Sequence, residues 1–131
     1  TPSVKLDVDG GVVSRHATAG IGYATGAGGT VTQLTDKSTS VTLNTICGLI
    51  TLAAENIPAG ARRTFTVLNS TVAATDGVHI GVANAGTLGA YIPWVSDVSA
   101  GSFSITIKNE TGGGLNEQPQ LFFVVFKSVV S

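Results

Sequence analysis

Charged residues are scarce in this chain. Of its 131 residues, 11% are Asp, Glu, Lys or Arg, the net charge is −1, and the seven basic residues are scattered along the sequence. A typical soluble domain has about 25% charged residues. Binding to nucleic acid normally requires clustered Lys and Arg that displace counterions from phosphates. The composition therefore predicts that nucleic acid is not a partner.

Cysteine is almost absent, and long apolar runs are missing. The one cysteine, Cys47, cannot form a disulfide within the chain, which excludes a disulfide-stapled secreted domain. It lies in an apolar, strand-like run and is interpreted as a small buried hydrophobe, because no nearby base or helix N-terminus would activate the thiol. No apolar run approaches the roughly 20 residues that a membrane helix needs. We expect no membrane span.

Recognised catalytic and ligand-binding patterns are missing as well. The glycine run at residues 26–29 lacks the Lys-Ser/Thr pair that closes a phosphate-binding loop. His16 and His79 have no metal-ligand partner at a recognised spacing. There is no Gly-x-Ser-x-Gly elbow and no His-Glu-x-x-His. We therefore predict no catalytic site, no metal and no cofactor, and a protein that is not an enzyme.

Strong strand signals are present, above all at residues 120–130. Side chains of a strand alternate between two faces. One face would carry Leu121, Phe123, Val125 and Val129, and the other Phe122, Val124, Phe126 and Val130. Because both faces are apolar, the sequence predicts a central strand with one face in the core and the other covered by more of this chain or by a neighbouring subunit.

Further strands are indicated at short intervals, with turns rich in Gly, Asn and Pro between them. They lie at residues 30–34, 40–44, 46–52, 61–69, 78–82, 89–95 and 102–109. Pro93 marks the strand at 89–95 as an edge or bulged strand, and residues 53–56 are the only plausible helical turn. This spacing favours an all-β protein, an antiparallel β-sandwich that is jelly-roll-like.

The domain organisation follows from the position of these signals. Residues 20–131 are predicted to form the sandwich domain, and residues 1–19, whose pattern is weak, an extended N-terminal arm that orders against a partner; a plain edge strand is the alternative. The core is predicted to contain Phe65, Val67, Ile80, Phe103, Ile105, Phe123 and Val125.

Candidate interface residues are of two kinds. Arg62 and Arg63 begin a strand and are either solvated strand-end charges or partners in an ion pair between subunits. Tyr91 and Trp94 are either core residues or interface aromatics. The outer face of the last strand adds Phe122, Val124 and Phe126.

Several segments together resemble a known family. Residues 28–33, 37–44, 48–51, 65–70, 74–76, 104–109 and 123–127 resemble small β-sandwich proteins of tailed-bacteriophage virions. The resemblance covers about residues 28–129 and rests on Thr, Val and Asn patterns. It implies a capsid decoration, or cementing, protein on the exterior of the phage head, with the major capsid protein as partner and a homo-oligomer, dimer or trimer, as the working unit.

A second role is compatible with the same resemblance. Similar modules occur in head or tail fibres, which bind glycans of the host surface. Glycan sites often combine exposed aromatics with Asp or Asn, and Tyr91, Trp94 and Asp97 could serve in this way.

Overall fold

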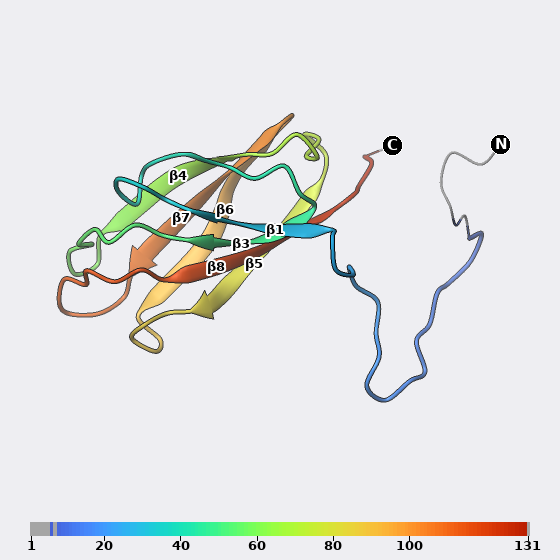
Figure 1. Cartoon of the computed structure of the whole chain (residues 1–131), viewed down its shortest axis with the longest axis horizontal. Helices are drawn as coiled ribbons and strands as arrows, with labels where there is room; N and C mark the ends of the chain where they lie inside the picture. Colours follow the sequence, from blue (N-terminus) through green and yellow to red (C-terminus); the bar gives the residue numbers. More distant parts are fainter. Residues whose placement is uncertain (1–5, 7, 131) are drawn as a thin grey trace.

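The computed structural model describes residue 6 and residues 8–130, and in this part of the chain it contains strands but no helix. The predicted all-β class is therefore confirmed (Figure 1). The strands are β1 (Gly28–Thr32), β2 (Val41–Thr42), β3 (Cys47–Thr51), β4 (Arg62–Leu68), β5 (Gly77–Asn84), β6 (Tyr91–Ser99), β7 (Ser102–Asn109) and β8 (Gln120–Phe126).

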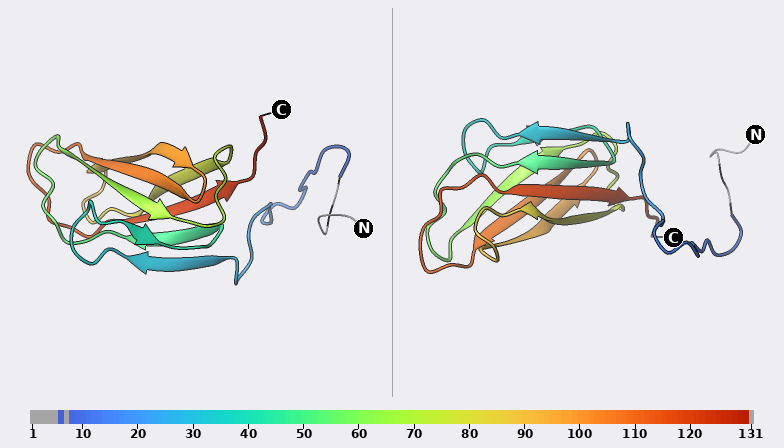
Figure 2. Two further views of the ribbon diagram at one scale, coloured as in Figure 1. Left: turned by 90° about the horizontal axis from the view of Figure 1, so that it is seen from above. Right: turned by 60° about the horizontal axis from the view of Figure 1, so that its bottom comes forward.

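The strands form two sheets of four that face each other as a β-sandwich (Figure 2). Sheet A has the order β1-β3-β8-β5, and sheet B has the order β2-β4-β7-β6. Two pairs, β1 with β3 and β2 with β4, are parallel, so the predicted antiparallel pairing is found in the other four strand pairs and is wrong for these two. The reason is that the first four strands alternate between the sheets. Each return to a sheet follows two reversals of direction, which makes the pair parallel.

The core lies between the sheets and is built from the inward side chains of the longer strands. Phe65, Val67, Phe103, Ile105, Phe123 and Val125 are buried as predicted, and Ile80 packs against them partly buried. The rings of Phe103 in sheet B and Phe123 in sheet A are 5.2 Å apart between centroids, in a tilted arrangement. This pair joins the two sheets through the kind of offset contact that aromatic rings favour.

β8 is a central strand, as the sequence predicts, with β3 on one side and β5 on the other. It ends at Phe126, so the predicted strand of 120–130 is too long at its C-terminal end, where Val129 and Val130 are exposed. β6 is an edge strand, as Pro93 suggests. A register shift between Val95 and Asp97 lets it continue to Ser99, beyond the predicted end at residue 95.

The chain before β1 contains no strand or helix in its described part, residue 6 and residues 8–27; we call this part the N-terminal segment. It leaves the sandwich at the end where β8 finishes and runs away from it (Figure 1). The edge strand given as the alternative to the arm is not found in residues 8–19, and residues 1–5 and 7 lie outside the described part. The division at residue 19 stays a prediction. Residues 53–56 form a bend, and the expected helical turn is absent there.

Candidate functional site

The outer face of sheet A carries no formal charge. The register of the four strands places a set of uncharged residues side by side on the outside of the sheet, while their neighbours in sequence point into the core. We call this set the uncharged face: Gly28, Thr30, Thr32, Cys47, Leu49, Thr51, Gly77, His79, Gly81, Gln120, Phe122, Val124 and Phe126. Phe122 and Phe126 are exposed apolar side chains on this face, and exposed apolar patches on a folded protein commonly mark an interaction site.

Phe122 lies at the centre of the uncharged face and leans onto the neighbouring strand β5. A Cβ atom at Gly81 would lie 2.6 Å from one carbon of the Phe122 ring, so only glycine allows the ring to lie there. The ring of His79 is 5.7 Å away between centroids and tilted by 51°. His79 therefore packs against an aromatic ring, and Phe122 lies on the outer face of the sheet; its role as an interface residue stays a prediction.

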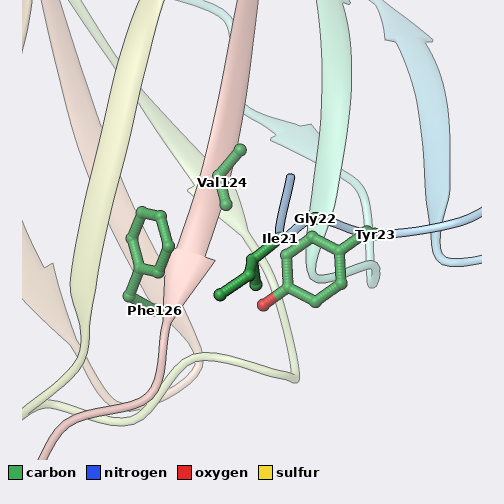
Figure 3. A pocket seen from close by; sticks show the side chains of 5 residues that line it. All are labelled: Ile21, Gly22, Tyr23, Val124 and Phe126. Carbon is green, nitrogen blue, oxygen red and sulfur yellow. The ribbon is translucent and has the colours of Figure 1, made fainter. Parts of the chain in front are cut away.

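The N-terminal segment contacts the uncharged face at the end where β8 finishes. Ile21, Gly22 and Tyr23 line a pocket of about 360 Å³ together with Val124 and Phe126 (Figure 3). The hydroxyl group of Tyr23 donates a hydrogen bond of 3.0 Å to the backbone carbonyl oxygen of Val125. Phe126 nevertheless remains 58% exposed. The segment thus begins to cover the uncharged face and covers only its end.

The rest of the N-terminal segment exposes large apolar side chains. These are Leu6, Val8, Val12, Val13, Ile21 and Tyr23, with exposed fractions of 44% to 78%. Among residues 8–27 the only formally charged side chains are Asp9 and Arg15. The side-chain hydrogen bonds found before Tyr23 are local, such as that from Ser14 Oγ to the Ala19 carbonyl oxygen at 2.8 Å. The segment therefore has the composition of a contact surface.

The outer face of sheet B is polar and carries Trp94 and Arg62. The guanidinium carbon of Arg62 lies 5.6 Å from the centroid of the Trp94 ring, a cation–π contact. Beside them, the hydroxyl oxygens of Thr64 and Thr106 are 2.8 Å apart. Asp97 lies further along β6 and is exposed. The structure thus brings Trp94 and Asp97 onto one strand of the same sheet, with hydroxyl groups between neighbouring strands.

Arg63 and Tyr91 are engaged within the chain. The Nε atom of Arg63 is 2.7 Å from a carboxylate oxygen of Glu55, an ion pair at the rim of the sandwich. Tyr91 is 6% exposed, and its hydroxyl group donates a hydrogen bond of 2.8 Å to Glu117. Of the two alternatives that the sequence left open for Tyr91, the structure shows the core residue, so Tyr91 is not available as a candidate interface residue.

The most unusual polar group is one that the sequence did not indicate. Lys37 is fully buried, and its ammonium group donates hydrogen bonds to the backbone carbonyl oxygens of Ala53 at 2.7 Å, Glu117 at 2.8 Å and Glu55. Burial lowers the pKa of Lys37. Its neighbours Asp36, Ser38 and Thr39 suggest a solvated turn, so only the three-dimensional arrangement of the loops reveals it.

The carboxylates around this ammonium group are held in the ionised form. Hydrogen bonds from the hydroxyl groups of Thr87 and Tyr91 lower the pKa of Glu117. Burial acts to raise the pKa of Glu55, but hydrogen bonds from Arg63 and from a backbone N–H outweigh it and lower the pKa. The cluster joins three loops at the end of the sandwich opposite the N-terminal segment, and its contacts are those of a structural element.

A second ion pair fixes the other end of the sandwich. The carboxylate of Asp76, just before β5, accepts hydrogen bonds from the backbone N–H of Ala73 at 2.8 Å and from the ammonium group of Lys127 at 2.5 Å. These two contacts, in that order, lower the pKa of Asp76. Lys127 follows β8 directly, so this pair anchors the strand end that bears Phe126.

The described residues gather no metal-binding group: no three His, Cys, Asp or Glu side chains lie together there. The ring nitrogen of His16 is 3.2 Å from the hydroxyl oxygen of Thr18, a local contact in the N-terminal segment. In the same described part, no helix has the length and apolar character needed to cross a membrane.

Comparison of the chain with protein-family models, with curated proteins and with solved structures finds no match. The functional interpretation therefore depends on the surfaces described above.

Proposed function

We propose that this chain is a decoration, or cementing, protein of a tailed-bacteriophage head, which binds the outer surface of the shell and braces neighbouring subunits of the major capsid protein. The observation that carries the proposal is the uncharged face of sheet A together with the exposed apolar side chains of the N-terminal segment. Burying such surface stabilises an assembly, whereas an isolated monomer leaves it in water. The resemblance of residues 28–129 to phage virion proteins suggests which assembly it is.

The proposed action is binding without a chemical step. A protein that binds one state of the shell stabilises that state by mass action. A homo-oligomer, dimer or trimer, would contact several coat subunits at once, so that modest contacts combine through multivalency. In this proposal residues 1–19 act as an arm that orders in the assembly. The jelly-roll-like arrangement stays a prediction, as does the location on the head exterior.

The test is binding of the purified protein to phage heads from which it has been stripped. We expect saturable co-sedimentation with expanded heads and, in a cryo-EM reconstruction, density repeated over the whole shell. Because the chain has few charges, raising the salt concentration to about 1 M, where the screening length falls to about 3 Å, should release little of it. Density confined to one vertex, or complete release by salt, would contradict the proposal.

A second function is favoured by one specific observation on sheet B. Trp94 and Asp97 lie along β6, next to hydroxyl groups of Thr64 and Thr106. An aromatic ring with nearby acceptors and hydroxyl groups is a surface that can bind a sugar. On this observation the chain would be a fibre-type module that recognises a glycan of the host surface.

The two functions can be separated with the intrinsic fluorescence of the protein. Trp94 is the only tryptophan, so its emission reports directly on the outer face of sheet B. The glycan function predicts a saturable change in emission on titration with oligosaccharides from the host surface, which Asp97→Asn weakens. The matched control is Asp9→Asn, which makes the same change at an exposed carboxylate in the N-terminal segment. An unchanged emission would exclude this site.

A further inference from the structure

We propose that the uncharged face of one copy of this chain is covered by the N-terminal segment of a second copy. The proposal rests on the part of the proposed function that makes the chain a subunit of an assembly, and it does not depend on the identity of the coat protein. It specifies which surfaces meet and which residues make the contact.

The first argument is that the contact is already begun within one chain. Ile21 and Tyr23 lie against Val124 and Phe126, and Tyr23 is hydrogen-bonded to the backbone of β8. Before Ile21 the chain turns away from sheet A instead of continuing along it, as Figures 1 and 2 show. The remainder of the uncharged face, around Phe122, is left without a cover from its own N-terminal segment.

The second argument is the length of the segment. An extended chain advances about 3.3 Å per residue, so residues 8–20 can span roughly 40 Å. The seven residues of β8 span only about 23 Å at the same rise. A segment that leaves the sandwich at its edge is therefore long enough to reach a neighbouring copy and to cross the whole uncharged face there.

The third argument is that the two surfaces match chemically. The uncharged face contains no Asp, Glu, Lys or Arg, and residues 8–20, which would cross it, contain only two charged side chains, Asp9 and Arg15. Contact between them therefore removes few charged groups from water, and burial of unpaired charge is the most costly part of forming a contact. Val12 and Val13, which are 60% and 77% exposed, supply apolar side chains, and Phe122 and Phe126 supply the complementary surface.

Donation of the N-terminal segment from one copy to the next would also produce an oligomer with a fixed number of copies. If every copy donates one segment and receives one, a reciprocal dimer or a closed ring of three leaves no face uncovered. Exchange of an identical element between copies is a low-cost route to such oligomers.

The experiment compares the oligomeric state of full-length variants by sedimentation velocity over a range of concentrations. In one variant Val12→Ser and Val13→Ser change the segment, and in another Phe126→Ser changes the face. The matched controls are Leu34→Ser and Leu88→Ser, which remove leucines that are 91% and 92% exposed and lie on neither surface. Circular dichroism checks that each variant keeps its strands, and the Val12 and Val13 changes alter side chains that are exposed in the monomer.

We expect the wild-type chain to be a dimer or trimer, each test variant to dissociate at a concentration at least tenfold higher, and both controls to behave as wild type. A wild-type monomer at all concentrations would overturn the proposal. So would an oligomer whose dissociation is unchanged in the Val12/Val13 variant or in the Phe126 variant.

Cys47 provides a second readout, because it is the only cysteine and lies on the uncharged face opposite Val124. Its reaction with a maleimide should be slow in the wild-type oligomer and faster in the Val12/Val13 variant. Slow reaction in a wild-type monomer that becomes fast in this variant would show that the segment covers its own face, which also contradicts the proposal. An oligomer that forms as predicted but does not bind phage heads would refute the decoration function alone.

Discussion

Replacing Lys37 by Met tests the loop cluster that closes one end of the sandwich. Methionine keeps the approximate length and apolar stem of the side chain but removes the ammonium group and its three hydrogen bonds to the carbonyl oxygens of Ala53, Glu55 and Glu117. Each buried acceptor left without a donor costs about 1–3 kcal/mol. Methionine carries no charge, so the variant avoids the free-energy cost of burying the ammonium group, which offsets part of the loss from the three acceptors.

The expected net loss for Lys37→Met is about 3–5 kcal/mol in the free energy of unfolding, the lower part of the summed cost of three unsatisfied carbonyl groups, because the cost of burying the charge is no longer paid. The assay is urea denaturation followed by Trp94 fluorescence and, independently, by circular dichroism. The control is Lys108→Met, which removes a partly exposed ion pair with Glu110 and should cost about 1 kcal/mol or less. If the two variants lost equal stability, the buried ammonium group would not be the structural element described above.

Three further changes test the core, the ion pair and the uncharged face. Phe123→Ala should lower the free energy of unfolding by about 3–5 kcal/mol in denaturant titration, because the ring is buried between the sheets; a loss as small as that of a surface substitution would show that the ring is not packed there. The pKa of Asp76 is lowered in the folded state, so the stabilisation by its carboxylate is fully present above the ordinary carboxyl pKa and is lost as the pH falls through the folded-state pKa. The midpoint of thermal unfolding should therefore depend less on pH in the acidic range for Asp76→Asn than for wild type. Identical pH profiles would contradict this. Gly81→Ala should displace the Phe122 ring and weaken oligomer formation, measured by sedimentation velocity. The control Gly112→Ala, where an added Cβ has no atom within 4 Å, should change neither. Oligomer formation that is unaffected by Gly81→Ala would contradict the assigned position of the ring.

The periodicity of the later strands could be read directly from the sequence. Phe103, Ile105 and Ile107 alternate with polar residues in β7, and the structure buries all three. β8 is apolar on both faces and lies in the centre of its sheet. The alternation of apolar and polar residues can be read from the sequence wherever one face of a strand is completely buried. The later strands and most of the predicted core were identified in this way.

Sheet membership and pairing direction could not be read in the same way. Short strands such as β2, with only two residues, carry no information about which sheet they join. The parallel pairs arise because β1 to β4 cross between sheets, a property of loop paths and not of alternation. The register shift between Val95 and Asp97 likewise extends β6 through residues that resemble a turn.

The candidate surfaces were predicted in part. Phe122, Val124 and Phe126 were assigned to the outer face of the last strand by period-two alternation, and the structure places them there. Alternation also separated Arg62 from Arg63, but it could not show that Arg63 pairs with Glu55. The burial of Tyr91 and Lys37 could not be predicted, because it depends on loops that are distant in sequence, which bring Glu117 to both.

The most direct test of the decoration function is the temperature at which purified phage heads release their DNA. If the protein braces the shell, heads stripped of it should keep their normal size but release DNA at a lower temperature than complete heads, and adding back the purified protein should restore the original temperature. Stripped heads that retain DNA as well as complete ones, but no longer adsorb to host cells, would contradict the bracing function and favour the glycan-binding module.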